Sequence, residues 1–217
     1  MSDRQNPLSC DGDPSWIARH PGVQRVPNRD LALFIVRNFL TPEECSGLVE
    51  LIDSKRRPST IADANGDHYF RTSETCEIDA AEPLVAAVDA RFADFAGIDP
   101  AHGEPMQGQR YAVGQEFKAH TDYFDPKGTD FEKYCGIAGN RTWTLMVYLN
   151  QPAAGGATRF LRIGKTIQPE IGKLLAWNNR LGPGVYNPSS LHHGMKVRAG
   201  VKHVITKWYR ERPWVSA

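Results

Sequence analysis

Two stretches in the first half of the chain have the apolar spacing of a helix that is buried on one side. The first follows the segment Thr-Pro-Glu-Glu at residues 41–44, which predicts a helix start with Thr41 as N-cap, Pro42 in the first turn and Glu44 closing a capping box. Its apolar stripe consists of Cys45, Leu48, Val49, Leu51 and Ile52. A second helix is predicted over residues 82–95, with the buried side Leu84, Val85, Val88, Phe92 and Phe95. We expect both helices to pack on a sheet.

Strand patterns dominate the second half of the chain. The short apolar run at residues 31–36 already predicts one buried strand. From Gln107 onward, short segments are separated by Gly, Pro and Asn, which is typical of a sandwich or barrel. The predicted strands are residues 109–113, 117–123, 142–150, 157–160, 173–178, 185–186, 193–197 and 202–209. Helices first and strands afterwards predict an α+β fold, a sheet structure backed by helices.

Side-chain alternation assigns faces in two of these strands. In residues 142–150, Thr144, Met146 and Tyr148 share one face, opposite an apolar face. In residues 202–209, Lys202 shares a face with Trp208. A lysine in this setting is either a charge that protects an edge strand or a buried cation that binds an anion.

Composition excludes some classes of protein. The 217 residues include 26 basic and 25 acidic ones, so the chain offers no general electrostatic attraction to nucleic acid or to a membrane surface. No apolar run has the length of a signal peptide or a membrane span. Four cysteines are scattered without a Cys-x-x-Cys pair, which favours reduced thiols and a cytoplasmic location over a zinc site or a disulfide framework.

The candidate chemistry begins with His120 and Asp122. If residues 117–123 form a strand, these two side chains point to the same face, as two ligands of a 2-His-1-carboxylate iron site do. Alone, the pair is weak evidence for a metal site, because such a tripeptide often arises by chance as a surface histidine beside a solvated aspartate. Two Gly- and Asp-containing loops, residues 59–69 and 125–140, are candidate lids over a site.

Longer motifs extend this pair. They are Arg110-Tyr-x-x-Gly-x-x-Phe-x-x-His120-x-Asp122-Tyr-Phe124, Arg141-x-x-Thr-Leu-Met-x-Tyr148-Leu-Asn150, Gly155-Gly-x-Thr-x-Phe160, Ser190-Leu-His192-His-Gly194, Gly200-Val-Lys202 and Lys207-Trp208. In this order they resemble the prolyl 4-hydroxylase branch of the Fe(II)/2-oxoglutarate-dependent dioxygenases. The resemblance implies a double-stranded β-helix, or jelly-roll barrel, at about residues 107–210, backed by helical support at about residues 41–96. Residues 15–217 then form a single domain after a loose N-terminal tail, residues 1–14.

The resemblance also implies the roles of individual residues. His120, Asp122 and either His192 or His193 would hold Fe(II). Lys202 lies ten positions after His192, the family's spacing to the base that binds 2-oxoglutarate, so His192 is preferred. Further expected 2-oxoglutarate contacts are Tyr111, Tyr148 and Thr144. Arg141 and Trp208 would contact the substrate, although core packing explains Trp208 equally well. Phe117 departs from the family, which often has Tyr three residues before the first ligand.

By the same resemblance, the protein hydroxylates a peptidyl proline while 2-oxoglutarate is decarboxylated to succinate and CO2. O2 is the second co-substrate, and L-ascorbate supports the iron. The substrate is then a protein or peptide with an exposed proline. One alternative is an oxygenase of a free amino acid or other small metabolite. A non-catalytic metal-binding jelly roll and a metal-dependent hydrolase are less favoured, because neither needs Lys202.

Overall fold

The structure is a computed structural model, and it describes residues 13–59 and 71–214. An antiparallel eight-stranded sheet forms its centre, with the order β1-β2-β11-β7-β16-β5-β4-β3. These strands are β1 (Val23–Arg25), β2 (Leu33–Val36), β3 (Arg57–Pro58), β4 (Glu74–Glu77), β5 (Gln107–Tyr111), β7 (Arg141–Tyr148), β11 (Leu174–Asn178) and β16 (Lys202–Arg210). The best-paired strands, β7 and β16, lie in the middle of this large sheet.

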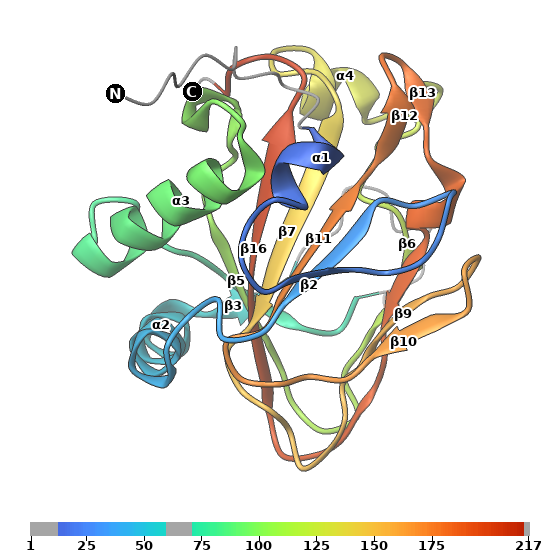
Figure 1. The fold of residues 1–217 in the computed structure, drawn as a ribbon. Helices are drawn as coiled ribbons and strands as arrows, with labels where there is room; N and C mark the ends of the chain where they lie inside the picture. The colour runs from blue at the N-terminus through green and yellow to red at the C-terminus, as the bar shows by residue number, and fades with distance from the viewer. Residues whose placement is uncertain (1–12, 60–70, 215–217) are drawn as a thin grey trace.

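A four-stranded small sheet lies against one face of the large sheet (Figure 1). Its order is β10-β9-β14-β6, from β6 (Phe117–His120), β9 (Thr158–Phe160), β10 (Lys165–Ile167) and β14 (His192–Gly194). Two ribbons complete the strands: β8 (Ala154–Gly155) with β15 (Val197–Ala199), and β12 (Arg180–Gly182) with β13 (Val185–Tyr186). A buried cluster that includes Phe160, Ile167, Tyr148 and Trp177 fills the space between the two sheets.

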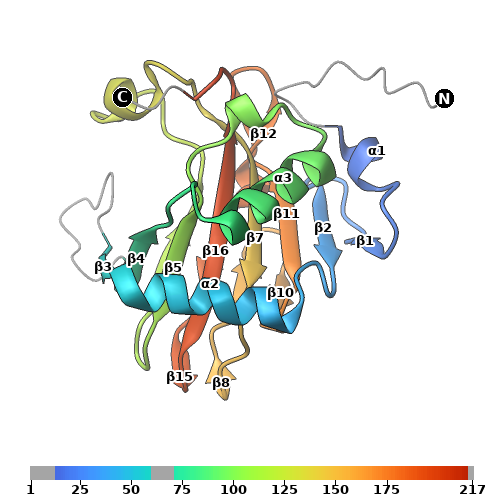
Figure 2. The same cartoon turned by 90° about the vertical axis from the view of Figure 1, so that its left-hand side faces the viewer.

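Helices α2 (Pro42–Lys55) and α3 (Pro83–Ala96) cover the other face of the large sheet, and α1 (Pro14–Ile17) packs on α3. The remaining helical segments are α4 (Phe131–Cys135) and the 3-10 turns η1 (Pro100–His102) and η2 (Pro188–Ser190). Figure 2 shows α2 and α3 lying across the same side of the sheet. Thr41 and Glu44 form the predicted capping box of α2, and Gly97 ends α3 in a left-handed conformation. The predicted α+β arrangement of helices on a sheet structure is confirmed.

Face assignments from alternation agree with the structure. Leu145 and Val147 of β7 contribute to the cluster beneath the helices, whereas Met146 and Tyr148 belong to the cluster between the sheets. Lys202 and Trp208 of β16 line one pocket together. The two-residue period of a strand therefore located the inner face correctly, because β7 and β16 are long and regular.

Two predicted strands are wrong in their extent. The strand predicted over residues 117–123 ends at His120, so Asp122 lies beyond it. The segment predicted over residues 193–197 divides into β14, which begins at His192, and β15, which pairs with β8. A register shift between His192 and Gly194 disrupts the ladder there, and period-two reasoning does not detect such a shift.

Several predictions concern residues that the structure does not describe. Residues 1–12 of the predicted tail, residues 60–69 of the first candidate lid, and Cys10 lie outside the described part of the chain. The second candidate lid, residues 125–140, contains α4. The described cysteines, Cys45, Cys76 and Cys135, are free and buried. None of the helices within residues 13–59 and 71–214 is long and apolar enough to cross a membrane.

Candidate active site

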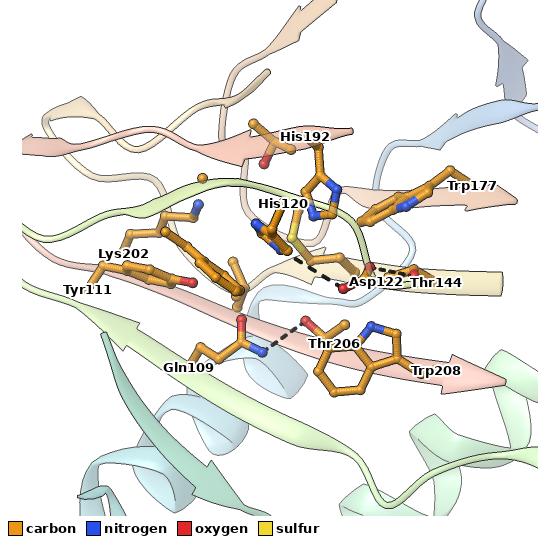
Figure 3. A pocket seen from close by; sticks show the side chains of 15 residues that line it. Gln109, Tyr111, His120, Asp122, Thr144, Trp177, His192, Lys202, Thr206 and Trp208 are labelled. Carbon is orange, nitrogen blue, oxygen red and sulfur yellow. Dashed lines mark hydrogen bonds and ion pairs between the residues drawn. The ribbon is translucent and has the colours of Figure 1, made fainter. Parts of the chain in front are cut away.

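Three potential metal ligands meet between the two sheets. His120 is the last residue of β6 and His192 the first of β14, and the two are direct partners in the antiparallel ladder. Asp122 follows two residues later, and one ligand atom of each side chain lies within 4.8 Å of the others. Figure 3 shows all three pointing into one pocket. His193 points elsewhere, because its Nε2 lies 2.9 Å from Glu116 Oε2.

Both histidines are oriented for metal binding by the backbone beside them. His120 Nδ1 lies 2.8 Å from the carbonyl oxygen of Lys118, and His192 Nδ1 lies 2.9 Å from that of Ser190. A carbonyl only accepts, so each Nδ1 carries the proton and each Nε2 keeps its lone pair. Burial, together with the nearby His192, lowers the pKa of His120 well below its ordinary value. The neutral imidazole required of a metal ligand is therefore favoured before a metal arrives.

The carboxylate of Asp122 is held by one of its two oxygens. Thr144 Oγ1 donates a 2.7 Å hydrogen bond to Oδ2, while Oδ1 lies 3.9 Å from His120 Nε2 and 3.9 Å from Arg141 Nη1. Burial opposes ionisation, but the surrounding His192, His120 and Arg141 hold the pKa of Asp122 below its ordinary value. The ionised carboxylate thus presents Oδ1 toward the histidines.

An unpaired cation lies deeper in the same pocket. Lys202 is 2% exposed, and its ammonium has no hydrogen bond or ion pair within the described part of the chain. Its Nζ lies 5.0 Å from the ring centre of Tyr111 and 5.4 Å from that of Tyr148. Burial lowers the pKa of Lys202 from 10.5 to about 7. A buried ammonium left without an anion is costly, so this position suits a ligand carboxylate.

The three residues whose hydroxyl groups are predicted to contact 2-oxoglutarate lie in or beside this pocket, and each hydroxyl already has a side-chain partner. Tyr148 donates to Thr158 Oγ1 at 2.6 Å, and Thr144 donates its single proton to Asp122. Tyr111 is buried and faces the lysine across its ring. The Tyr111 hydroxyl is hydrogen-bonded to the side chains of Ser73 and Arg71. Their contact with a co-substrate stays a prediction.

The two predicted substrate residues, Arg141 and Trp208, form a stacked pair at the mouth of the pocket. The guanidinium carbon of Arg141 lies 3.9 Å from the ring centre of Trp208. Glu104 fixes this arginine with hydrogen bonds of 2.6 and 2.9 Å, and also accepts a 2.6 Å hydrogen bond from Arg210. All four residues line an outer cleft that continues from the metal ligands, with a volume of about 1590 Å³ including space open to solvent.

Sequence reasoning missed several residues of the site. Glu104 precedes β5 and no local motif distinguishes it, because its role depends on arginines from two other strands. Trp177 packs edge-on against His192 with ring centres 4.9 Å apart, and only its place at the end of an apolar strand hinted at burial. Asn179 follows the same strand, and its side chain donates a hydrogen bond to Thr144.

The donor set fits Fe(II). Two imidazoles and one carboxylate on one side of the ion leave open positions, the arrangement of non-heme iron oxygenases. The indole Nε1 atoms of Trp177 and Trp208, both pocket residues, are buried without a partner among the described residues. These two indole N–H groups and the ammonium of Lys202 are therefore donors that a bound molecule could accept hydrogen bonds from.

Comparison with known proteins identifies the class. The model of the 2OG-Fe(II) oxygenase superfamily matches residues 106–210. Probable prolyl 4-hydroxylase 10 of Arabidopsis thaliana is 30% identical over 201 residues, which cover 81% of this chain and 68% of that protein. The chain belongs to the 2OG-Fe(II) oxygenase superfamily, in its prolyl 4-hydroxylase family, and is therefore an Fe(II)- and 2-oxoglutarate-dependent enzyme, as predicted.

Other relatives differ in length. Prolyl 4-hydroxylase subunit alpha-1 of Gallus gallus is 29% identical over 180 residues, 81% of this chain but 35% of that subunit. The chain therefore spans about a third of the length of that relative. The 2-oxoglutarate complex of the viral collagen prolyl hydroxylase from Paramecium Bursaria Chlorella virus-1 has a TM-score of 0.61 at 24% identity, covering 82% of this chain and 94% of that one. This likeness confirms the predicted jelly-roll fold.

Proposed function

We propose that the protein is a prolyl 4-hydroxylase that acts on peptidyl proline. Family membership supports the reaction type, and the buried, unpaired ammonium of Lys202 behind the three ligands is the observation that carries the proposal. With Fe(II), 2-oxoglutarate and O2 bound, the site supplies hydroxylation of the substrate coupled to decarboxylation of 2-oxoglutarate to succinate and CO2. His120, Asp122 and His192 hold the metal.

The protein's own groups position the reactants. Lys202 neutralises the far carboxylate of 2-oxoglutarate with a charge-assisted hydrogen bond, within a pocket whose walls exclude water. The pocket lies between two packed sheets, so the co-substrate is held on rigid strands and not on loops. The rings of Tyr111 and Tyr148 flank the ammonium, with centres 5.0 and 5.4 Å from its Nζ, and form part of the wall around the bound carboxylate.

The outer cleft supports a peptide as the substrate. Phe124, Tyr134, Trp208 and Trp214 line it, and aromatic-lined grooves bind extended, proline-rich chains. Arg141 is stacked on one of these rings and fixed by Glu104, so it presents a rigid edge at the point where the cleft meets the metal ligands. A polyproline segment loses little conformational entropy on binding because it is already stiff.

A second candidate, hydroxylation of a free amino acid, is favoured by Arg71. This guanidinium lines the outer cleft, and its hydrogen bonds to described residues go to neutral groups, including Ser73 Oγ at 3.1 Å and Gln107 Oε1 at 3.1 Å. No carboxylate lies within 4.0 Å of it in the described residues, so it offers a partner for the α-carboxylate of a free amino acid.

A substrate comparison separates the two candidates. Purified protein is supplied with Fe(II), 2-oxoglutarate and either short proline-rich peptides or free proline, and succinate release and oxygen incorporation are measured. Peptides should stimulate succinate release above the rate without substrate and gain one oxygen atom on proline. Efficient hydroxylation of free proline, with no peptide modified and with loss of activity in Arg71→Gln, would establish the second candidate instead.

Two further features belong to this proposal. L-ascorbate is the expected supporting reductant, since it commonly maintains the iron of related enzymes. A cytoplasmic location is proposed from the cysteine pattern, and the buried free thiols of Cys45, Cys76 and Cys135 are consistent with a reducing compartment. The substrate partner is then a protein or peptide with an exposed proline.

A further inference from the structure

Beneath the metal ligands lies a buried hydrogen-bond chain of three side chains. Asn179 Nδ2 donates to Thr144 Oγ1 at 2.8 Å, and Thr144 Oγ1 donates to Asp122 Oδ2 at 2.7 Å. Asn179 and Thr144 are both 0% exposed, and Asp122 is 6% exposed. The chain therefore runs from a residue that does not line the pocket to one of the metal ligands.

The direction of each hydrogen bond in this chain is fixed. The ionised carboxylate of Asp122 only accepts, so the single hydroxyl proton of Thr144 must point to it. The lone pairs of Thr144 then require a donor, which the Asn179 amide supplies through its nitrogen. As a result, Asn179 Oδ1 is buried with no hydrogen-bond partner among the described residues. The amide nitrogen is directed at Thr144 although this leaves the amide oxygen unsatisfied, which is unfavourable.

The main chain of Asn179 also contacts the segments that carry the other parts of the site. Its N–H donates to the Thr142 carbonyl at 2.8 Å, and its carbonyl accepts from the N–H of Asn187 at 3.0 Å. The Asn187 carbonyl in turn accepts from Ser190 Oγ at 2.7 Å, and the Ser190 carbonyl holds His192 Nδ1. One residue is thus linked to Asp122 through its side chain and to the loop before His192 through its backbone.

We infer that Asn179 is a positioning residue for the metal site, and that it acts on Asp122 through the hydroxyl of Thr144. The chain ties down Oδ2, so that Asp122 presents Oδ1 alone toward His120 and His192. Outer hydrogen bonds of this kind orient a ligand before the metal binds and typically change metal affinity by about 10- to 100-fold when removed. This role rests on the metal site of the proposed function.

The test measures divalent-metal affinity of the metal-free protein without 2-oxoglutarate, by titration with Mn(II) as a stand-in for Fe(II) that resists oxidation. Thr144→Val should weaken Mn(II) binding by roughly 10- to 100-fold, Thr144→Ser should restore it, and Asn179→Ala should weaken it by about tenfold. In the Thr144→Val background, Asn179→Ala should have no additional effect, because the hydroxyl through which it acts is gone.

Asn178→Ala is the matched control. Asn178 is the neighbouring residue, and its side chain accepts from Ala32 N at 2.9 Å and from Asn187 Nδ2 at 3.4 Å, and donates to the Arg180 carbonyl at 2.9 Å. Among the described residues it makes no hydrogen bond to Thr144 or Asp122, so it tests the side-chain route to the metal ligand while sharing the contact with Asn187. Its loss should lower thermal stability and leave Mn(II) affinity within about twofold of wild type. Equal weakening by Asn178→Ala, unchanged affinity in Asn179→Ala, or additive effects in the double variant would overturn the role of Asn179. Absence of Mn(II) binding by the wild-type protein would instead refute the metal site itself.

Discussion

Replacing Lys202 by methionine should have two opposite consequences. Methionine keeps an unbranched side chain of similar length but removes the charge, so the packing between the sheets is largely retained. Without the ammonium, a carboxylate that enters the pocket has no counter-charge. We therefore expect 2-oxoglutarate binding to be lost, while the ligand-free protein becomes more stable.

The magnitudes follow from the burial of this lysine. A fall in its pKa from 10.5 to about 7 corresponds to about 5 kcal/mol, which is a ceiling for the stability gained by removing the charge. Replacing even a buried ion pair by apolar side chains is often neutral or stabilises the protein by about 1–4 kcal/mol, and for this charge without a counter-ion we expect a gain in that range. The loss of one partner of a desolvated ion pair costs about 2–5 kcal/mol, or roughly 30- to 5000-fold in the Kd of 2-oxoglutarate.

The sign of the pH dependence is part of this prediction. Because the pKa of Lys202 is lower in the folded protein, the unfolded chain binds more protons between pH 7 and 10.5, and the destabilisation decreases as pH rises through that window. Lys202→Met should therefore be more stable than wild type at pH 7 and should lose this advantage by about pH 10.5.

Calorimetric titration and thermal unfolding, each with and without 2-oxoglutarate, measure both effects. The exposed Lys165 provides a control, since Lys165→Met should change neither quantity. Unchanged 2-oxoglutarate affinity in Lys202→Met would refute the assigned role. If ligand-free Lys202→Met were less stable than wild type at pH 7, the ammonium of Lys202 would have a stabilising partner in the folded protein, contrary to this account.

Three other predictions follow. Above pH 7, the Kd of 2-oxoglutarate should rise about tenfold per pH unit, because Lys202 must take up a proton; titrations in buffers of different ionisation enthalpy will detect that uptake, and a flat profile would contradict it. His192→Ala should abolish metal binding and turnover, whereas His193→Ala should retain both, and the reverse result in a metal titration would exchange their roles. Glu104→Gln should destabilise the protein by about 3–5 kcal/mol in urea unfolding and raise the peptide KM, because Arg141 loses its buried partner; a change under about 1 kcal/mol would argue against this network.

The sequence predicted features that depend on local periodicity. The start of α2 was predicted from Thr41 and Glu44, which interact within one helical turn. The faces of β7 and β16 were predicted because a long regular strand keeps its two-residue period. The choice of His192 over His193 came from family spacing, since the register shift in β14 makes alternation uninformative there.

Features that depend on contacts between distant segments were not predicted. Asp122 was assigned to a strand, but it lies past the end of β6 and is oriented by Thr144 from another sheet. Glu104 and Asn179 interact with residues 37 and 35 positions away, so no local motif signals them. The sequence also does not indicate that Thr144 donates its hydroxyl proton to Asp122, because that hydrogen bond forms only when the two segments meet in the folded protein.

The most direct test of the proposed function uses isotopically labelled dioxygen. Wild-type protein with Fe(II), 2-oxoglutarate and a proline-rich peptide should place one labelled oxygen atom in hydroxyproline and one in succinate, in equal amounts, as measured by mass spectrometry. His192→Ala should yield neither product. Succinate labelled without any label in the peptide would contradict the peptidyl-proline substrate, and no labelled product at all with the metal-loaded wild type would contradict the oxygenase itself.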